Sequence, residues 1–266
     1  MIPLERQRAI LQMLDDQGSV SINNLVEALD VSHMTVRRDI HRLEELGRVV
    51  SVLGGVSRPE RLALDQSHIV KEGLKQAEKL AIARVAVERV QPGNVVFLDA
   101  GTTTLAIAHR LAPMPNLVFI TNDLSIALSL SEPSTNELYF AGGALDRANL
   151  SSDGSLTARM IAQFNVDVAF TSTSSFDLRG TSVPTDAKLA VKRAIKDSAA
   201  RTILVSDSSK YGRVANLHAV KLTDIDEIIT DSGLADSAVE KIQELGIPLT
   251  LVDPHIDSTN EGKFQR

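Results

Sequence analysis

The sequence predicts an α/β protein in two parts: a small domain of short helices and a β-hairpin, then a larger domain around a mostly parallel sheet. Before residue 47, apolar residues recur at helical spacing in three short segments, and two β-rich runs follow. From about residue 74, continuous apolar runs alternate with helical patterns, which is typical of parallel strands covered by helices on both faces. The 266-residue chain, with 43% apolar and 23% charged residues, has an ordinary globular composition.

Three helices and a wing are expected in the first domain. The first helix covers residues 3–16 and opens with a proline, which suits a first helical turn. The second follows Ser21 and the third follows Ser32, both typical N-cap residues, and Gly47 ends the third. Residues 48–58 then read as two short strands around a Gly-Gly turn. Three short helices followed by a hairpin predict a winged helix-turn-helix.

The third helix has a polar surface suited to DNA. Its exposed side chains carry hydroxyl, imidazole and guanidinium groups near the N-terminal end, where the helix dipole also favours phosphate. Residues 32–58 hold five arginines against three acidic residues, although residues 1–58 hold seven arginines, no lysine and eight acidic residues. Arginine can read guanine edges or clamp a phosphate. The residues expected to contact DNA are Ser32, His33, Met34, Thr35, Arg37, Arg38, His41, Arg48 and Gly54.

Composition excludes several function classes. A net charge of −6 argues against a uniformly basic nucleic-acid coat, but not against a local DNA-binding surface. The absence of cysteine excludes disulfides, thiolate zinc sites and cysteine nucleophiles. The six histidines show no metal-ligand spacing, and no dinucleotide, P-loop or nucleophile-elbow motif occurs, so neither a metal nor a cofactor is expected.

A soluble, cytoplasmic protein with no membrane partner is expected. The N-terminal MIPLERQR lacks the apolar stretch of a secretory signal, and no window approaches about 18 consecutive apolar residues. The expected segments are the winged helix-turn-helix at 1–57, a linker at 58–73, an effector domain at 74–252 and a polar tail at 253–266.

The effector domain is expected to alternate strands and helices. The predicted strands are residues 95–99, 117–121, 137–141, 167–172, 202–207, 227–230 and 249–252. The first predicted helix of this domain ends before Pro92. The other four cover residues 103–111, 124–130, 156–163 and 186–199. Ligands of such sheets bind outside the carboxyl ends of the strands, so the residues after each strand are the candidates for a site.

Hydroxyl-rich and glycine-rich turns follow five of these strands. Gly101 lets the backbone approach a ligand, and three threonine hydroxyls and helix N–H groups then form a phosphate cradle. Each turn alone is more typical of helix capping or of an ordinary turn, and only their recurrence at successive strand ends favours a site for a polyol phosphate. The residues expected to bind the effector are Asp99, Gly101, Thr102, Thr103, Thr104, Thr121, Asn122, Asp123, Gly142, Gly143, Arg147, Ser174, Lys192, Asp207 and Lys210.

Several motifs match a known protein family in both residue type and spacing. Arg6, Ile10 and Leu14 precede, by 17 residues, a run from Ser32 to Ile40 that contains TVRRDI. The runs DAGTTT, TND, AGG, VKRA, DSSKYGR and ITD follow, ending at Asp231. This pattern resembles the DeoR family of bacterial repressors over nearly the whole chain to that residue. The runs HMTVRRD, LDAGTTTLAIA and VKRAI are most similar to YgbI-like members.

The resemblance implies a fold and a function. The effector domain would be Rossmann-like and similar to ribose-5-phosphate isomerase and the glucosamine-6-phosphate deaminases. The DAGTTT loop would hold a phosphate, and Lys210 would match the family's lysine at the pocket. The chain would be a repressor of a sugar or sugar-acid catabolic operon, binding a double-stranded operator as a dimer or tetramer and responding to a small sugar-phosphate effector.

One departure from the family pattern bears on the alternatives. Many relatives carry G-A-D-G after the fourth strand, and the isomerases carry carboxylates there, whereas residues 172–175 read STSS. Without that carboxylate, enolisation lacks its base, which favours a non-enzyme over a phosphosugar isomerase or deaminase. The hydroxyl at Ser174 also suits an acidic or phosphorylated ligand. The third alternative, a protein-interaction module, predicts no salt-dependent DNA affinity.

Overall fold

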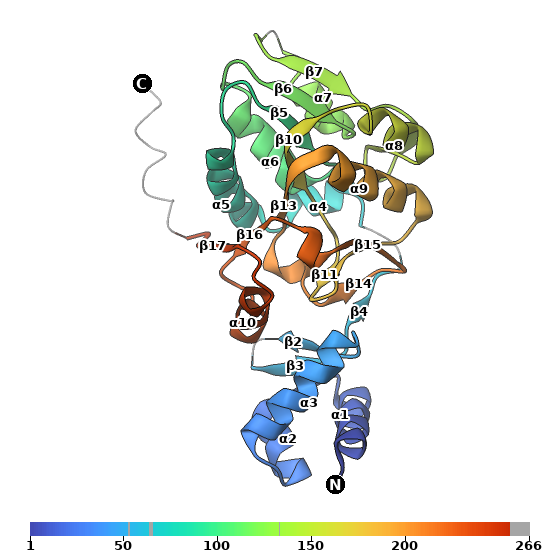
Figure 1. The fold of residues 1–266 in the computed structure, drawn as a ribbon, viewed down its shortest axis with the longest axis vertical. Helices are drawn as coiled ribbons and strands as arrows, with labels where there is room; N and C mark the ends of the chain where they lie inside the picture. The colour runs from blue at the N-terminus through green and yellow to red at the C-terminus, as the bar shows by residue number, and fades with distance from the viewer. Residues whose placement is uncertain (53, 64–65, 133, 256–266) are drawn as a thin grey trace.

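The computed structural model describes residues 1–52, 54–63, 66–132 and 134–255. A small N-terminal domain lies at one end of an elongated molecule, and a larger α/β domain forms the other end (Figure 1). The predicted polar tail lies outside the described residues from position 256 onward.

The N-terminal domain is a winged helix-turn-helix, as predicted. Its elements are α1 (Pro3–Gln17), β1 (Ser19–Ser21), α2 (Ile22–Leu29), α3 (His33–Glu45), β2 (Val50–Val52) and β3 (Gly55–Ser57). The short strand β1 was not expected. It pairs antiparallel with β3, which lies between β1 and β2, and so joins the wing to the helices. The apolar faces of the three helices meet in one core that contains Ile10, Leu25 and Val36.

A buried ion pair fastens α1 to α3. The Arg6 Nε atom donates to Asp39 Oδ2 at 2.7 Å, and Gln7 Nε2 donates to Asp39 Oδ1 at 3.3 Å. The side chains of Arg6 and Asp39 are only 8% and 5% exposed. Removing one partner of such a pair leaves a buried charge without compensation. The helix crossing therefore depends on a polar contact at the edge of the apolar core.

Replacing Arg6 with alanine is expected to destabilise this domain strongly. A buried pair that loses one member costs about 3–5 kcal/mol of unfolding free energy. Urea denaturation followed by circular dichroism measures the change. The matched control is Arg8→Ala, at an exposed position of the same helix, for which a change within about 0.5 kcal/mol is expected. Equal stability of the two variants would contradict a structural role for the pair.

The segment predicted as a linker is partly regular. It contains β4 (Glu60–Arg61) and α4 (His68–Gly73). Polar contacts hold them: the Ser67 hydroxyl caps α4 by accepting from Val70 N at 3.5 Å, and His68 N donates to Ala148 O at 2.8 Å. Such polar contacts require no regular spacing of apolar residues. The sequence of this segment therefore lacked a helix or strand pattern and indicated a linker.

The larger domain is built on a seven-stranded, wholly parallel sheet. Its strands are β5 (Val95–Leu98), β6 (Val118–Thr121), β7 (Glu137–Phe140), β10 (Val166–Thr171), β13 (Ala199–Val205), β16 (Glu227–Asp231) and β17 (Leu249–Val252). Their order in the sheet is β17-β16-β13-β10-β5-β6-β7. The chain first builds outward from β5 to β7, then returns to the other side of β5 at β10. The order thus reverses between β5 and β10, where open α/β sheets bind ligands.

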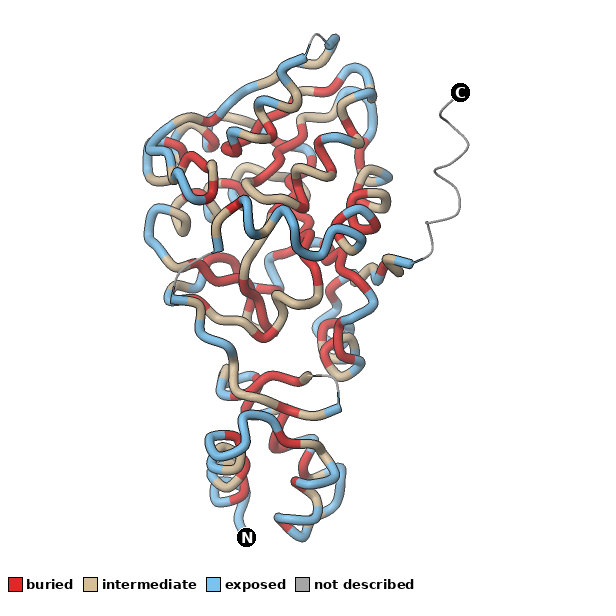
Figure 2. Tube along the Cα trace, turned by 180° about the vertical axis from the view of Figure 1, so that it is seen from behind, coloured by how far each residue is buried: buried red, intermediate tan, exposed pale blue. Residues whose placement is uncertain are grey.

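Helices cover both faces of this sheet. They are α5 (Gln76–Ala86), α6 (Thr102–Leu111), α7 (Leu124–Ser129), α8 (Ser155–Ile161) and α9 (Asp186–Ser198). Alternate strand residues separate into two cores: Val96 and Leu98 pack with α5 and α6, whereas Phe97 packs with α8 and α9. The buried positions run through the centre of the domain in Figure 2. The predicted fold class, a winged helix-turn-helix plus a mostly parallel α/β domain, is confirmed.

Several short elements were not predicted. They are the hairpin β8 (Ala144–Asp146) and β9 (Ser151–Asp153), the sheet of β11 (Phe176–Asp177), β12 (Gly180–Val183) and β15 (Leu217–Lys221), the strand β14 (Arg213–Val214), and α10 (Asp236–Glu244). The strands are two to five residues long and lack apolar alternation, which left no local signal. Within the described ranges, no helix has both the length and the apolar character needed to cross a membrane.

Candidate functional site

A cavity opens at the point where the strand order reverses. It holds roughly 910 Å³ when its open mouth is included, and both the loop after β5 and the loop after β10 line it. Nine of the predicted effector residues lie in its lining: Asp99, Gly101, Thr102, Thr103, Asn122, Ser174, Lys192, Asp207 and Lys210. The structure therefore brings together residues that are up to about 110 positions apart in the sequence.

Three other predicted residues support the cavity from behind. Thr104 donates its hydroxyl hydrogen to Gly101 O at 2.7 Å, and Thr121 donates to Leu98 O at 2.7 Å. Asp123 accepts from Gly101 N at 3.1 Å while capping α7 through its other carboxylate oxygen. Burial raises the pKa of Asp123, and hydrogen bonds from backbone N–H groups oppose that rise. These side chains shape the loop and do not line the cavity.

The remaining three predicted residues are not in the lining of the cavity. Gly142 and Gly143 follow β7, which is the edge strand of the sheet and lies two positions from β5. Arg147 is exposed on the turn between β8 and β9. The chain returns to the cavity just beyond this turn, because Asn149, Ser151 and Asp153 are in the lining.

The carboxylate of Asp99 joins three elements at the floor of the cavity. Its Oδ2 atom accepts from Ser172 N at 2.8 Å, which ties the end of β5 to the end of β10. Lys192 of α9 also donates to this oxygen. Because the Lys192 ammonium and the Asp99 carboxylate are paired with each other, they form a structural bridge across the switch point.

The first turn of α6 presents backbone N–H groups to the cavity. Ala100 N and Gly101 N are already bound by Asn122 Oδ1 at 3.2 Å and Asp123 Oδ2 at 3.1 Å. No side chain caps the helix, and Thr102 and Thr103, its first two residues, line the cavity. A helix start of this kind attracts an anion, because its N–H groups and dipole both favour negative charge. A β-carbon at Gly101 would lie 2.9 Å from Ser172 Oγ, so the loop packs too tightly for any other residue.

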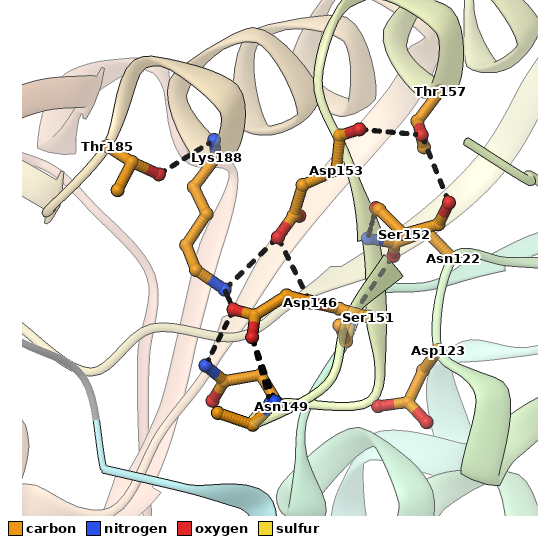
Figure 3. A network of polar contacts seen from close by, with 12 residues as sticks. Asn122, Asp123, Asp146, Asn149, Ser151, Ser152, Asp153, Thr157, Thr185 and Lys188 are labelled. Atoms are coloured by element: carbon orange, nitrogen blue, oxygen red, sulfur yellow. Dashed lines mark hydrogen bonds and ion pairs between the residues drawn. The ribbon is translucent and has the colours of Figure 1, made fainter. Parts of the chain in front are cut away.

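Sequence reasoning missed three lysines of the lining, Lys71, Lys79 and Lys188. Lys188 lies between Asp146 Oδ2 at 3.2 Å and Asp153 Oδ2 at 3.3 Å, as Figure 3 shows. Lys71 of α4 donates to Asn149 Oδ1 at 2.7 Å. These lysines come from helices and not from strand ends, so no strand-end motif could have indicated them.

A short turn fixes Lys210 at the cavity. Residues Ser208–Lys210 form the 3-10 helix η2, whose first N–H groups are capped by Asp207 through Ser209 N at 3.2 Å. Ser208 donates from its backbone N and its hydroxyl to the buried carboxylate of Asp231, both at 2.7 Å. The DSSK and ITD motifs therefore act together, because one carboxylate anchors the turn that carries the lysine.

The second candidate surface is the outer face of α3. Ser32 caps the helix by accepting from Thr35 N at 3.3 Å. Val36 and Ile40 face the core, whereas His33, Met34, Arg37 and Arg38 are exposed, with Met34 75% accessible. The remaining predicted contacts differ in exposure: Thr35 and His41 are half-buried, and Arg48 and Gly54 are exposed at the start and tip of the wing.

Contacts with the larger domain hold the far end of α3. Lys241 of α10 forms an ion pair with Glu44, whose other carboxylate oxygen accepts from Ser51 N of the wing at 2.7 Å. The guanidinium of Arg179 lies against Gly47, so closely that a β-carbon there would overlap it. The orientation of α3 is therefore set partly by the sensor side of the molecule.

The segment from Asp207 to Val214 connects the cavity to the wing. Beyond Lys210, Gly212 lies against Val50 of β2, at 3.0 Å from the β-carbon position to Val50 Cγ2. Gly212 O accepts from Glu60 N at 3.1 Å, and β14 pairs in parallel with β4. One continuous segment of eight residues thus contacts the ligand cavity at one end and the DNA-binding domain at the other.

Comparisons with known proteins match both domains. The model of the DeoR-like helix-turn-helix domain matches residues 6–61, and that of the DeoR C terminal sensor domain matches residues 74–232. An HTH-type transcriptional regulator of Haemophilus influenzae is 46% identical over 95% of this chain and 98% of its own. The HTH-type transcriptional regulator YgbI of Escherichia coli is 47% identical over 90% of this chain and 93% of its own.

A curated repressor and a solved structure also match this chain. The glycerol-3-phosphate regulon repressor of Escherichia coli is 31% identical over 93% of this chain and 98% of its own. Ribose 5-phosphate isomerase A of Methanocaldococcus jannaschii superposes with a TM-score of 0.37 at 16% identity, over 50% of this chain and 53% of that one. The prediction of a transcriptional regulator, and not an enzyme, is confirmed by the relatives' names and the helix-turn-helix match. The chain belongs to the DeoR family of transcriptional regulators, with a DeoR-like helix-turn-helix domain followed by a DeoR C-terminal sensor domain.

Proposed function

We propose that this protein represses a sugar or sugar-acid catabolic operon and that a phosphorylated sugar in the sensor cavity changes its affinity for the operator. The observation that carries the proposal is the segment from Asp207 to Val214, which lines the cavity and contacts the wing. The wing is bonded to α3 through Ser51 and Glu44, so a ligand that moves this segment acts on the orientation of α3. The relative named a glycerol-3-phosphate regulon repressor supports both the sign of regulation and the class of ligand.

The DNA contacts follow from the exposed face of α3. Its N-terminal turns enter the major groove, where Arg37 and Arg38 contact base edges or phosphates, and the wing contacts the backbone. The third helix and wing of each copy, residues 32–58, carry only five arginines, so high affinity for the operator requires more than one copy of the chain. A dimer or tetramer would present recognition helices about 34 Å apart, one turn of the double helix.

The phosphate binds at the start of α6. The backbone N–H groups of Thr102 and Thr103, at the start of the helix, favour a negatively charged group, and Gly101 lets the loop pack closely against Ser172. The Lys192–Asp99 pair holds this loop against β10 and keeps it preorganised.

The proposal is tested with DNA from upstream of the gene for this chain. Fluorescence anisotropy should give an operator affinity that falls steeply with salt, because each phosphate contact releases a counterion. A thermal-shift screen of sugar phosphates should identify a compound that raises the melting temperature by mass action. The same compound should change the operator affinity. Salt-independent DNA binding, or no stabilising sugar phosphate, would contradict the proposal.

Replacing Gly101 with alanine is expected to remove the response to the sugar phosphate. The added β-carbon would lie 2.9 Å from Ser172 Oγ and 3.0 Å from Ser172 Cβ, so the loop must move away from the first turn of α6. Calorimetry should show at least about tenfold weaker binding, equivalent to about 1.4 kcal/mol. The matched control is Gly73→Ala, where a β-carbon meets nothing within 4 Å. Unchanged affinity in Gly101→Ala would place the phosphate elsewhere.

A further inference from the structure

We propose that the effector carries two anionic groups, a phosphate at the start of α6 and a carboxylate bound by Lys79, Lys210 and His68. This inference rests on the proposed function, because it concerns the ligand of the same cavity. It adds that the ligand is a phosphorylated sugar acid and not a phosphorylated aldose or ketose. The three side chains come from α5, η2 and α4, and all lie in the lining of the cavity.

The charges of the lining support a second anion. Lys192 is paired with Asp99, and Lys188 lies between Asp146 and Asp153, so the charges of these lysines are balanced within the protein. Lys79 and Lys210, in contrast, form no ion pair with another described residue, and the carboxylate of the lining whose charge acts on Lys79 is that of Asp207. A carboxylate of the ligand would add a second negative charge, so that the ammonium groups of both Lys79 and Lys210 would be balanced.

Lys79 is buried at a site that provides little compensation for its charge. It is 7% exposed, and its ammonium donates to a neutral acceptor, the carbonyl oxygen of Lys71. Burial lowers the pKa of Lys79, the carboxylates of Asp207 and Glu72 oppose that effect, and the ammonium groups of Lys210 and Lys71 add to it. A buried ammonium beside a second ammonium is costly unless an anion joins them. A ligand carboxylate would supply that anion and further hydrogen-bond acceptors.

His68 provides an independent observation in the lining of the same cavity. It is 4% exposed, and its Nε2 atom is buried without a hydrogen-bond partner. Buried polar atoms of side chains are nearly always bonded, so an orphaned one in a cavity lining points to a ligand atom. A protonated Nε2 would donate to a carboxylate oxygen.

The spacing of the strands fits a ligand with anions at both ends. The loop after β5 holds the phosphate, and Lys210 follows β13, with β10 between these two strands. Two strand spacings of about 4.8 Å separate β5 from β13 by roughly 10 Å, which is the scale of a short polyol chain with a charged group at each end. Ser174 lies between them and can donate a hydrogen bond without repelling either anion.

The test compares matched ligands on the full-length chain by isothermal titration calorimetry. Aldonic acid phosphates of four, five and six carbons are paired with aldose phosphates of the same length, and a sugar bisphosphate is included. At one chain length or more, the aldonate phosphate should bind at least about tenfold tighter than its aldose partner. Lys79→Met should lose this preference and still bind the aldose phosphate. The control Lys221→Met removes an exposed charge outside the cavity and should retain the preference.

The outcomes separate this inference from the proposed function. Equal or tighter binding of the aldose phosphates at every length would overturn the inference and leave the sugar-phosphate function standing. Binding of neither series would overturn both. A bisphosphate that binds as tightly as the best aldonate phosphate, and loses that affinity in Lys79→Met, would support the two-anion cavity and identify the second group as phosphate.

Discussion

Replacing both Arg37 and Arg38 with alanine should abolish operator binding while the chain remains folded. Both side chains are exposed on the outer face of α3, next to the N-terminal turn that DNA-reading helices place in the major groove. An arginine that contacts a base contributes about 1–3 kcal/mol, so losing two such contacts weakens binding by about 30-fold to 20,000-fold. Fluorescence anisotropy with the operator measures this loss.

The control for this pair is Arg193→Ala, which removes one exposed arginine from the sensor domain. It should bind the operator as the unmodified chain does, and the circular dichroism of all variants should coincide. Retained operator affinity in the double variant would show that α3 does not read DNA, and the helix would then be assigned to a protein partner.

Replacing Gly212 with alanine should separate ligand binding from the operator response. Gly212 has a φ of +82°, and its β-carbon position lies 3.0 Å from Val50 Cγ2 of the wing. An alanine there is strained and also pushes against β2, which changes how the wing seats on the sensor domain. Calorimetry should give an unchanged ligand affinity, whereas the ligand-induced change in operator affinity should disappear from its expected range of about 5–150-fold.

Gly93→Ala is the matched control, because Gly93 also has a positive φ, of +94°, but nothing lies within 4 Å of its β-carbon position. It imposes a similar backbone strain without a contact between the domains, and it should keep the full response. If the ligand changes the operator affinity of the Gly212→Ala and Gly93→Ala proteins equally, the segment from Asp207 to Val214 does not couple the cavity to the wing.

Local patterns in the sequence predicted the elements that carry regular periodicity. The three helices of the first domain follow their apolar spacing and their Ser21 and Ser32 caps, and the seven sheet strands follow their continuous apolar runs. The loop after β5 also had a local signal, because Gly101 and the threonines form a motif at a strand end, and the structure places Gly101, Thr102 and Thr103 in the cavity lining. Elements as short as β14, by contrast, have no period of their own to detect.

The placement of the other site residues depends on topology and packing. The position of β7 at the sheet edge cannot be read from the sequence, so Gly142 and Gly143 looked equivalent to Gly101 although they are not in the cavity lining. Lys79 and His68 enter the lining because α5 and α4 pack beside the switch point, which is a tertiary event. The contact between Gly212 and Val50 joins two domains and has no local signature.

The central claim is that one chain couples an anion in the sensor cavity to the orientation of α3. The most direct test is an anisotropy titration of the full-length protein on its operator, with and without a saturating concentration of the stabilising sugar phosphate. A shift of about 5–150-fold in the operator dissociation constant is expected. An operator affinity that stays the same while calorimetry shows the ligand bound in the same sample would contradict the claim.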